Sequence, residues 1–226
     1  MKLFPCRPGA GSAMTVVAIM TVMTIAGPAM AFFDRGFVDP AYNRTRLARA
    51  GEDAGPLAPD APVQAGLEES FSVIWNDYEI TATHGFGIEA IVMSKRAYEY
   101  GDMSSLVPMD LALAWGNVSD PEWLEHLRVS QEERLYVWSF PRGTVLDART
   151  VIANSANMHI MPATVSLLEE VREIRAGDLV RISGFLANIS GPDGFFWNTS
   201  LVRTDTGRGS CEIILLQDIE IVRDGE

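Results

Sequence analysis

The chain has few of the residues that usually mark a catalytic or metal site. Its 226 residues include only two cysteines and three histidines. The histidines, His84, His126 and His159, are far apart, and no H-E-x-x-H motif, C-x-x-C motif or phosphate-binding loop occurs. Compact motifs of this kind are the strong sequence evidence for a bound metal or nucleotide. We therefore expect neither a metal nor a cofactor.

Basic residues are also scarce. Lysine and arginine number 18 against 30 aspartates and glutamates, which gives a formal net charge of −12 at pH 7. A surface with this charge repels the phosphate backbone of a nucleic acid. We therefore exclude nucleic acid as an expected partner.

The start of the chain is typical of a secretory signal peptide. Lys2 and Arg7 precede the apolar run Ala13–Ala26, and an A-x-A cleavage signal ends at Ala31. The alternative is a permanent membrane anchor, but the run is shorter than the about 20 residues that a bilayer span needs. The sequence therefore predicts a signal peptide over residues 1–31, membrane contact only before its cleavage, and a periplasmic or extracellular protein.

Cleavage leaves 16 basic and 30 acidic residues, a net charge of −14, and a single cysteine, Cys211. With one cysteine the cleaved chain has no intramolecular disulfide, so its stability must come from the core. Residues 32–67 are rich in alanine, proline, glycine and aspartate and predict a flexible arm. Residues 68–226 predict a single β-rich globular domain.

Alternating apolar and polar residues predict several strands in this domain. Tyr78–His84 alternates, Gly85–Gly87 predicts a turn, and Ile88–Tyr98 follows as a second strand, so we expect a hairpin. Leu135–Phe140 is a further strand, and Val151–Met161 is interpreted as another.

Two short helices are predicted from their capping residues. Asp120 precedes Pro121 and is expected to cap a helix of about two turns. Thr164 is expected to cap a second helix from Val165 to about Ile174. Apolar residues at helical spacing give this second helix one face to bury.

The last third of the chain predicts a three-stranded meander. The strands are Leu179–Ile189, Phe195–Arg203 and Cys211–Val222, with glycine-rich turns between them. Gly184, inside the first strand, predicts a bulge or bend.

The pattern G-D-x-V-x-I-x-G-x-L at Gly177–Leu186, the aromatic strand after it and Asp205-Thr-Gly207 resemble the opening meander of an OB-type barrel. The fold class is therefore expected to be mainly β (α+β): an OB-like partly closed barrel, or a β-sandwich, with two short helices. The resemblance implies an oligonucleotide or oligosaccharide ligand, and the charge disfavours the first. A fold alone implies no activity.

One polar cluster is a candidate binding site. In an extended segment, Ser155, Asn157 and His159 point the same way at steps of about 7 Å. With Trp197 and Arg203 they are expected to edge a groove. The first hypothesis is a non-catalytic binding domain for a protein partner or a cell-envelope saccharide. The alternative without a binding role is that these side chains only form hydrogen bonds with local backbone groups and pack in the domain.

The second hypothesis is a hydrolase or acyl transferase that uses Cys211 or Ser155 as nucleophile and His159 as base. On the strand interpretation, however, Cys211 shares a face with Ile213 and Leu215, which is the position of a buried, inert thiol. We therefore assign no catalytic residue from the sequence.

Overall fold

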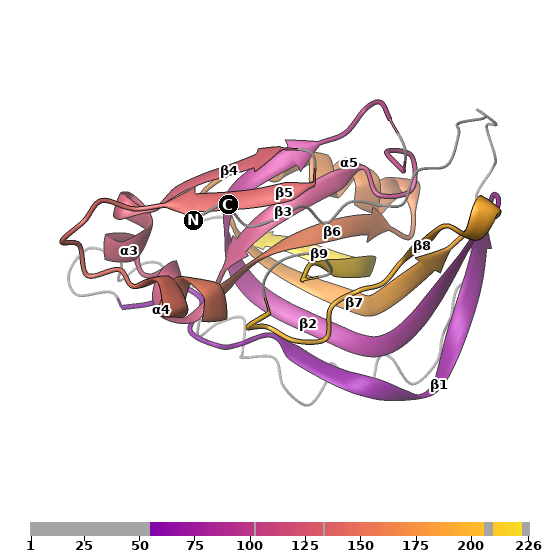
Figure 1. Ribbon diagram of the computed structural model, residues 1–226, viewed down its shortest axis with the longest axis horizontal. Coiled ribbons are helices and arrows are strands. Elements are labelled where there is room, and N and C mark those ends of the chain that lie inside the picture. Colours follow the sequence, from indigo (N-terminus) through magenta and orange to yellow (C-terminus); the bar gives the residue numbers. More distant parts are fainter. Residues whose placement is uncertain (1–54, 102, 133, 206–209, 223–226) are drawn as a thin grey trace.

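The computed structural model describes residues 55–101, 103–132, 134–205 and 210–222. The predicted signal peptide, residues 1–31, and the first part of the predicted arm, residues 32–54, lie outside the described residues. The described chain is mainly β, as predicted, with a few short helices (Figure 1).

Five strands form a closed ring of hydrogen bonds. β7 pairs with β9 on one side and returns to β2 on the other, and each neighbouring pair is antiparallel except β6 and β9, which are parallel. The ring confirms the barrel form of the predicted fold class. In order around the ring, the strands are β2 (Tyr78–Ala97), β3 (Met109–Ala114), β6 (Ser155–Pro162), β9 (Glu212–Val222) and β7 (Leu179–Ser190).

The predicted hairpin over residues 78–98 is wrong, because β2 is one strand of 20 residues. At its centre, Gly85 pairs with Ala65 of β1 on one edge and with Phe185 of β7 on the other. A backbone that is hydrogen-bonded on both edges cannot turn back on itself. The glycines mark a bend instead, which a strand needs when it belongs to a barrel.

β1 (Val63–Trp75) begins inside the range predicted as a flexible arm. It pairs with β2 and forms one edge of the sheet. Before it, the backbone oxygen of Ala58 accepts a bond from the Gly116 amide at 2.7 Å, and Ala58 is fully buried. The described part of the predicted arm is therefore docked on the domain.

The second predicted helix is present and packs on the barrel. α5 (Val165–Glu173) follows Thr164, whose hydroxyl accepts a hydrogen bond from the Leu167 amide at 3.2 Å. Leu167 and Val171 are buried in the same apolar core as the inward-facing residues of the five ring strands. The burial of these two apolar side chains stabilises this short helix.

The chain between β3 and β6 forms an insertion on the outside of the barrel. Its hairpin, β4–β5, pairs only with itself in the described chain and lies along β3 and β6 (Figure 1). Asp120 caps α3 as predicted, with its side chain accepting from the Glu122 amide at 2.9 Å. The elements are η1 (Gly116–Ser119), α3 (Pro121–His126), β4 (Arg128–Glu132), β5 (Leu135–Ser139) and α4 (Ala148–Ala153).

α4 was missed, because residues 151–161 were interpreted as one strand. Asp147 caps this helix by accepting hydrogen bonds from the Arg149 and Thr150 amides, both at 3.0 Å. The strand β6 begins only at Ser155. A capping aspartate before an apolar run was the signal available in the sequence.

The predicted meander at the end of the chain is also wrong. Its middle strand is reduced to β8 (Phe196–Trp197), and β9 pairs directly with β7. Side chains replace the missing ladder: Asn188 accepts from the Thr199 amide, and Thr199 accepts from the Ile213 amide, each at 3.0 Å. A three-residue 3-10 turn, η2 (Pro192–Gly194), links β7 to β8.

Gly184 behaves as predicted, because the register between β7 and β9 shifts between Ser183 and Gly184. A Cβ atom at Gly184 would lie 2.2 Å from the backbone oxygen of Leu215. We expect Gly184→Ala to lower the free energy of unfolding by about 1–3 kcal/mol, the range for overpacking. Urea denaturation measures this.

The control is Gly66→Ala on the edge strand β1, where the nearest atom to an added Cβ lies 3.8 Å away. It is expected to change stability by less than about 0.5 kcal/mol. Equal losses in the two variants would contradict the close approach at Gly184.

Candidate functional site

The polar residues of β6 lie on the outer face of the barrel. Ala156 and Met158 alternate with them and pack in or against the barrel core. Ser155, Asn157 and His159 are nevertheless buried, with exposed fractions of 5%, 3% and 0%. They are buried because the β4–β5 hairpin covers this face.

A fully buried carboxylate fixes the hairpin to the barrel. One oxygen of Asp110, on β3, lies 2.7 Å from the Arg134 guanidinium and 2.8 Å from Nδ1 of His159. Its other oxygen accepts from the Tyr98 hydroxyl at 3.0 Å. Arg134 lies between β4 and β5 and also donates to the backbone oxygen of Val107 at 2.7 Å. The Asp110 carboxylate therefore joins the β4–β5 hairpin to strands β3 and β6 of the barrel.

The surroundings of Asp110 keep it ionised. Burial alone would raise the pKa of its carboxyl, but the His159 ring and the Arg134 guanidinium, which both bond it, hold that pKa below its usual value. Burial, together with the Asp110 charge, raises the pKa of Tyr98 to about 12. Tyr98 therefore remains a donor to the carboxylate at neutral pH.

His159 and Trp197 are part of this buried packing rather than of an open groove. Their ring centroids lie 4.6 Å apart, and Trp197 is only 6% exposed. The Arg134 guanidinium lies 5.9 Å from the centroid of the Trp197 ring. Arg203 lies instead 5.9 Å from the ring of Phe86.

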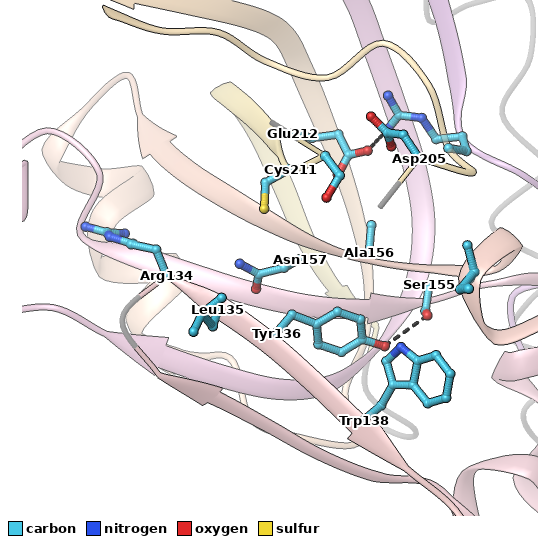
Figure 2. A pocket seen from close by; sticks show the side chains of 13 residues that line it. Arg134, Leu135, Tyr136, Trp138, Ser155, Ala156, Asn157, Asp205, Cys211 and Glu212 are labelled. Carbon is cyan, nitrogen blue, oxygen red and sulfur yellow. Dashed lines mark hydrogen bonds and ion pairs between the residues drawn. The ribbon is translucent and has the colours of Figure 1, made fainter. Parts of the chain in front are cut away.

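A cleft collects the other three predicted site residues, Ser155, Asn157 and Arg203. Its volume is about 50 Å³, enough for a few waters or a small polar group and far below the about 300 Å³ of a typical ligand pocket. Figure 2 shows β5 side chains on one side and residues around the start of β9 on the other. The further lining residues are Arg134, Leu135, Tyr136, Trp138, Ile152, Ala156, Asp205, Ser210, Cys211 and Glu212.

Glu212 and Arg203 form the charged wall of the cleft. Glu212 is 1% exposed, and one of its carboxylate oxygens bonds the Arg203 guanidinium. Burial raises the pKa of Glu212 to about 7, although the Arg203 charge opposes this. Arg203 also donates to the backbone oxygen of Ser200 at 3.2 Å, and the Ser200 hydroxyl donates to Asp205 at 2.7 Å.

Several buried polar atoms at the cleft have no hydrogen-bond partner among the described residues. They include Nδ2 of Asn157, the second carboxylate oxygen of Glu212 and Nε of Arg203. The other end of the Asn157 amide accepts from Gln131 of the hairpin at 2.5 Å. Buried polar groups are normally satisfied, so unsatisfied ones at a cleft need an explanation.

The serine-based catalytic arrangement finds little support in this geometry. The Ser155 hydroxyl donates to the backbone oxygen of Val151 at 2.5 Å and accepts from Tyr136 at 2.9 Å. His159 is four residues further along the same strand, which is about 13 Å at 3.3 Å per residue. A base must lie within hydrogen-bond reach of the nucleophile it activates.

Cys211, the other candidate nucleophile, is buried with an exposed fraction of 8% and lines the cleft. A reactive cysteine is normally partly exposed beside a positive charge, whereas a buried one is inert. Its burial agrees with the strand interpretation of the sequence.

Sequence reasoning missed Asp110 and Arg134, the residues that fix the hairpin. For Asp110 a signal existed, because it is the lone charge in the apolar run Met109–Trp115, and a charge in a buried strand needs a partner. For Arg134 no local signal existed, because its partner lies 24 residues away on another element.

Comparison of the chain with protein families, with curated proteins and with solved structures finds no match. Across residues 55–222, apart from the few positions left undescribed, no helix is both long and apolar enough to span a bilayer. In the same part of the chain, no group of three or more histidine, cysteine or acidic side chains is placed to hold a metal ion.

Removing the buried carboxylate tests its role in stability. Asp110→Ala leaves the buried Arg134 charge unpaired, and we expect a loss of about 3–5 kcal/mol in the free energy of unfolding. The control is Glu220→Ala, which removes an exposed partner of Arg181 while Glu89 still pairs with that arginine. It is expected to cost less than about 1 kcal/mol. Similar losses in both variants, measured by urea denaturation, would be inconsistent with the buried pair.

Glu212 makes the stability depend on pH. Its folded-state pKa of about 7 is above the unfolded value of about 4.3, so the folded chain binds the proton more tightly. The contribution of Glu212 to wild-type stability therefore falls as pH rises between these values and is constant above them. Relative to wild type, Glu212→Gln is expected to gain about 3 kcal/mol across this window.

The measurement is the free energy of unfolding at several pH values for wild type, Glu212→Gln and the exposed control Glu79→Gln. Glu79→Gln is expected to follow wild type. A difference between Glu212→Gln and wild type that does not change with pH would show that the burial of Glu212 does not have this effect.

Proposed function

We propose that the chain is an exported, non-catalytic binding domain that recognises a protein partner or a cell-envelope saccharide at the cleft between β5, β6 and the start of β9. One observation carries the proposal: the buried side chains of Asn157 and Glu212 line the cleft with hydrogen-bonding atoms unpartnered in the described chain. A lost hydrogen bond costs about 1–3 kcal/mol when the group is buried. A bound polar group would restore it.

The fold supports a binding role at this place. OB-type barrels bind ligands on the face of their second and third strands and through the loop before the last strand. Here the corresponding ring strands are β3 and β6, and the hairpin covers most of their outer face. The cleft remains open beside β6 and the residues that precede β9. This support is analogy at the level of the fold.

The pairing of charges supports binding over catalysis. Asp110 is held by Arg134, His159 and Tyr98, and Glu212 is held by Arg203. Such pairing keeps Asp110 ionised and ties the Glu212 carboxylate to Arg203. Export rests on the predicted signal peptide, which is a feature of the sequence.

The test is an NMR titration of ¹⁵N-labelled protein with two panels, N-acetyl dipeptide amides and methyl glycosides. At least one compound is expected to produce saturable shifts that are confined to backbone amides of the cleft, around Asn157 and Glu212. Asn157→Ala should weaken these shifts, while Ser72→Ala, an exposed hydroxyl paired with Thr81, should not. Cleft amides that stay unmoved by both panels would contradict the proposal.

The catalytic alternative has its own test. Because Ser155 is bonded to Val151 and Tyr136 and is far from His159, we expect wild type and Ser155→Ala to hydrolyse p-nitrophenyl acetate at the same rate. Release of p-nitrophenol followed by absorbance measures this. A burst of product in wild type that is absent from Ser155→Ala would favour the acyl transferase instead.

A further inference from the structure

The two cations of the cleft have no charge to spare for an anionic ligand. The Arg134 guanidinium is paired with Asp110, and the Arg203 guanidinium is paired with Glu212. Asp205 accepts from the Ser200 hydroxyl. An anionic ligand group that entered the cleft would lose its hydration and find no unpaired cation. Such burial is strongly unfavourable.

The remaining hydrogen-bonding capacity is mixed. Asn157 Nδ2 and Arg203 Nε are donors, and the second oxygen of Glu212 is an acceptor when ionised. A carboxylate ligand only accepts and an ammonium ligand only donates, so each would leave part of this set unsatisfied. A hydroxyl group both donates and accepts, and two neighbouring hydroxyls can satisfy a donor and an acceptor together.

The size and walls of the cleft limit what enters. About 50 Å³ admits hydroxyl groups but not a whole sugar ring, so the ring must lie at the mouth. Tyr136 and Trp138 line one wall with exposed fractions of only 9% and 6%, and Trp138 stacks on Phe140 with centroids 5.7 Å apart and planes within 4°. Aromatic side chains of this kind combine a large apolar surface with a polar edge, which suits a ligand with both.

An extended peptide fits this site less well. β6 pairs with β9 only from Met158 and Glu212 onward, so its open edge at the cleft spans just residues 155–157. Peptides that add to a sheet need a longer run of free backbone groups, since strands average about 5–6 residues.

Resting on the proposed function, we propose that the ligand of the cleft is an uncharged saccharide, which inserts neighbouring hydroxyl groups between Asn157 on one side and the Arg203–Glu212 pair on the other, with its ring against the Tyr136–Trp138 wall.

The experiment compares sugars that differ in charge. Methyl glucoside, methyl mannoside and methyl galactoside are titrated into ¹⁵N-labelled protein, alongside glucuronate as the anion and glucosamine as the cation. At least one neutral glycoside is expected to shift the amides of the cleft saturably. The charged sugars are expected to bind at least about tenfold more weakly, a difference of about 1.4 kcal/mol.

A variant tests the role of the pair. Arg203→Gln removes one donor of the cleft and the cation that opposes the rise in the pKa of Glu212. Glu212 is then neutral, so we expect the neutral glycoside to bind more weakly and glucosamine to bind no better than it binds to wild type. The control is Arg181→Gln, which disrupts the ion pairs of Arg181 with Glu89 and Glu220 outside the cleft. It should change the affinity for neither glucosamine nor the neutral glycoside. Thermal unfolding checks that both variants are folded.

Three results would overturn the inference. Glucuronate or glucosamine binding to wild type as tightly as the best neutral glycoside would show that the cleft selects charge. Shifts at the cleft with N-acetyl dipeptide amides and none with any sugar would leave the proposed binding function standing and remove the saccharide. Shifts with neither panel would remove both.

Discussion

The Asp110 carboxylate, buried beneath the β4–β5 hairpin, is the interaction on which the rest of the structure depends. It joins Arg134 of the hairpin to His159 of the barrel and accepts a third bond from Tyr98. A buried charge is tolerated only where it is paired and hydrogen-bonded, so the hairpin has one position on the barrel. That position covers the outer face of β6 and leaves a small polar cleft beside Asn157.

Much of the fold follows from local signals in the sequence. The Thr164 cap, the apolar stripe of α5 and the bulge at Gly184 depend on near neighbours, and each is present. Two errors, the hairpin over residues 78–98 and the terminal meander, share one cause, which is pairing between distant segments. Gly85–Gly87 is typical of a turn, but hydrogen bonds on both edges keep it extended. The strand that begins at Phe196 ends after Trp197, because side-chain hydrogen bonds of Asn188 and Thr199 replace the backbone ladder.

The candidate site could be predicted only in part. Alternation along an extended segment was enough to place Ser155 and Asn157 on one face. It could not show that His159 and Trp197 pack against each other beneath the hairpin, while Arg203 reaches the cleft from a loop. Whether a polar residue of β6 is buried by packing or lines the cleft depends on the element that covers it. In this chain that element is the β4–β5 hairpin, whose position is fixed by the long-range ion pair between Arg134 and Asp110.

The central claim is that the unpartnered atoms of Asn157 and Glu212 receive a neutral ligand. The most direct measurement is a high-resolution crystal structure of the protein soaked with the neutral glycoside that binds best in solution. The account predicts sugar hydroxyls within hydrogen-bond distance of Asn157 Nδ2 and of the Glu212 carboxylate, with the ring beside Trp138. A cleft that holds only water, with the sugar bound elsewhere, would contradict it.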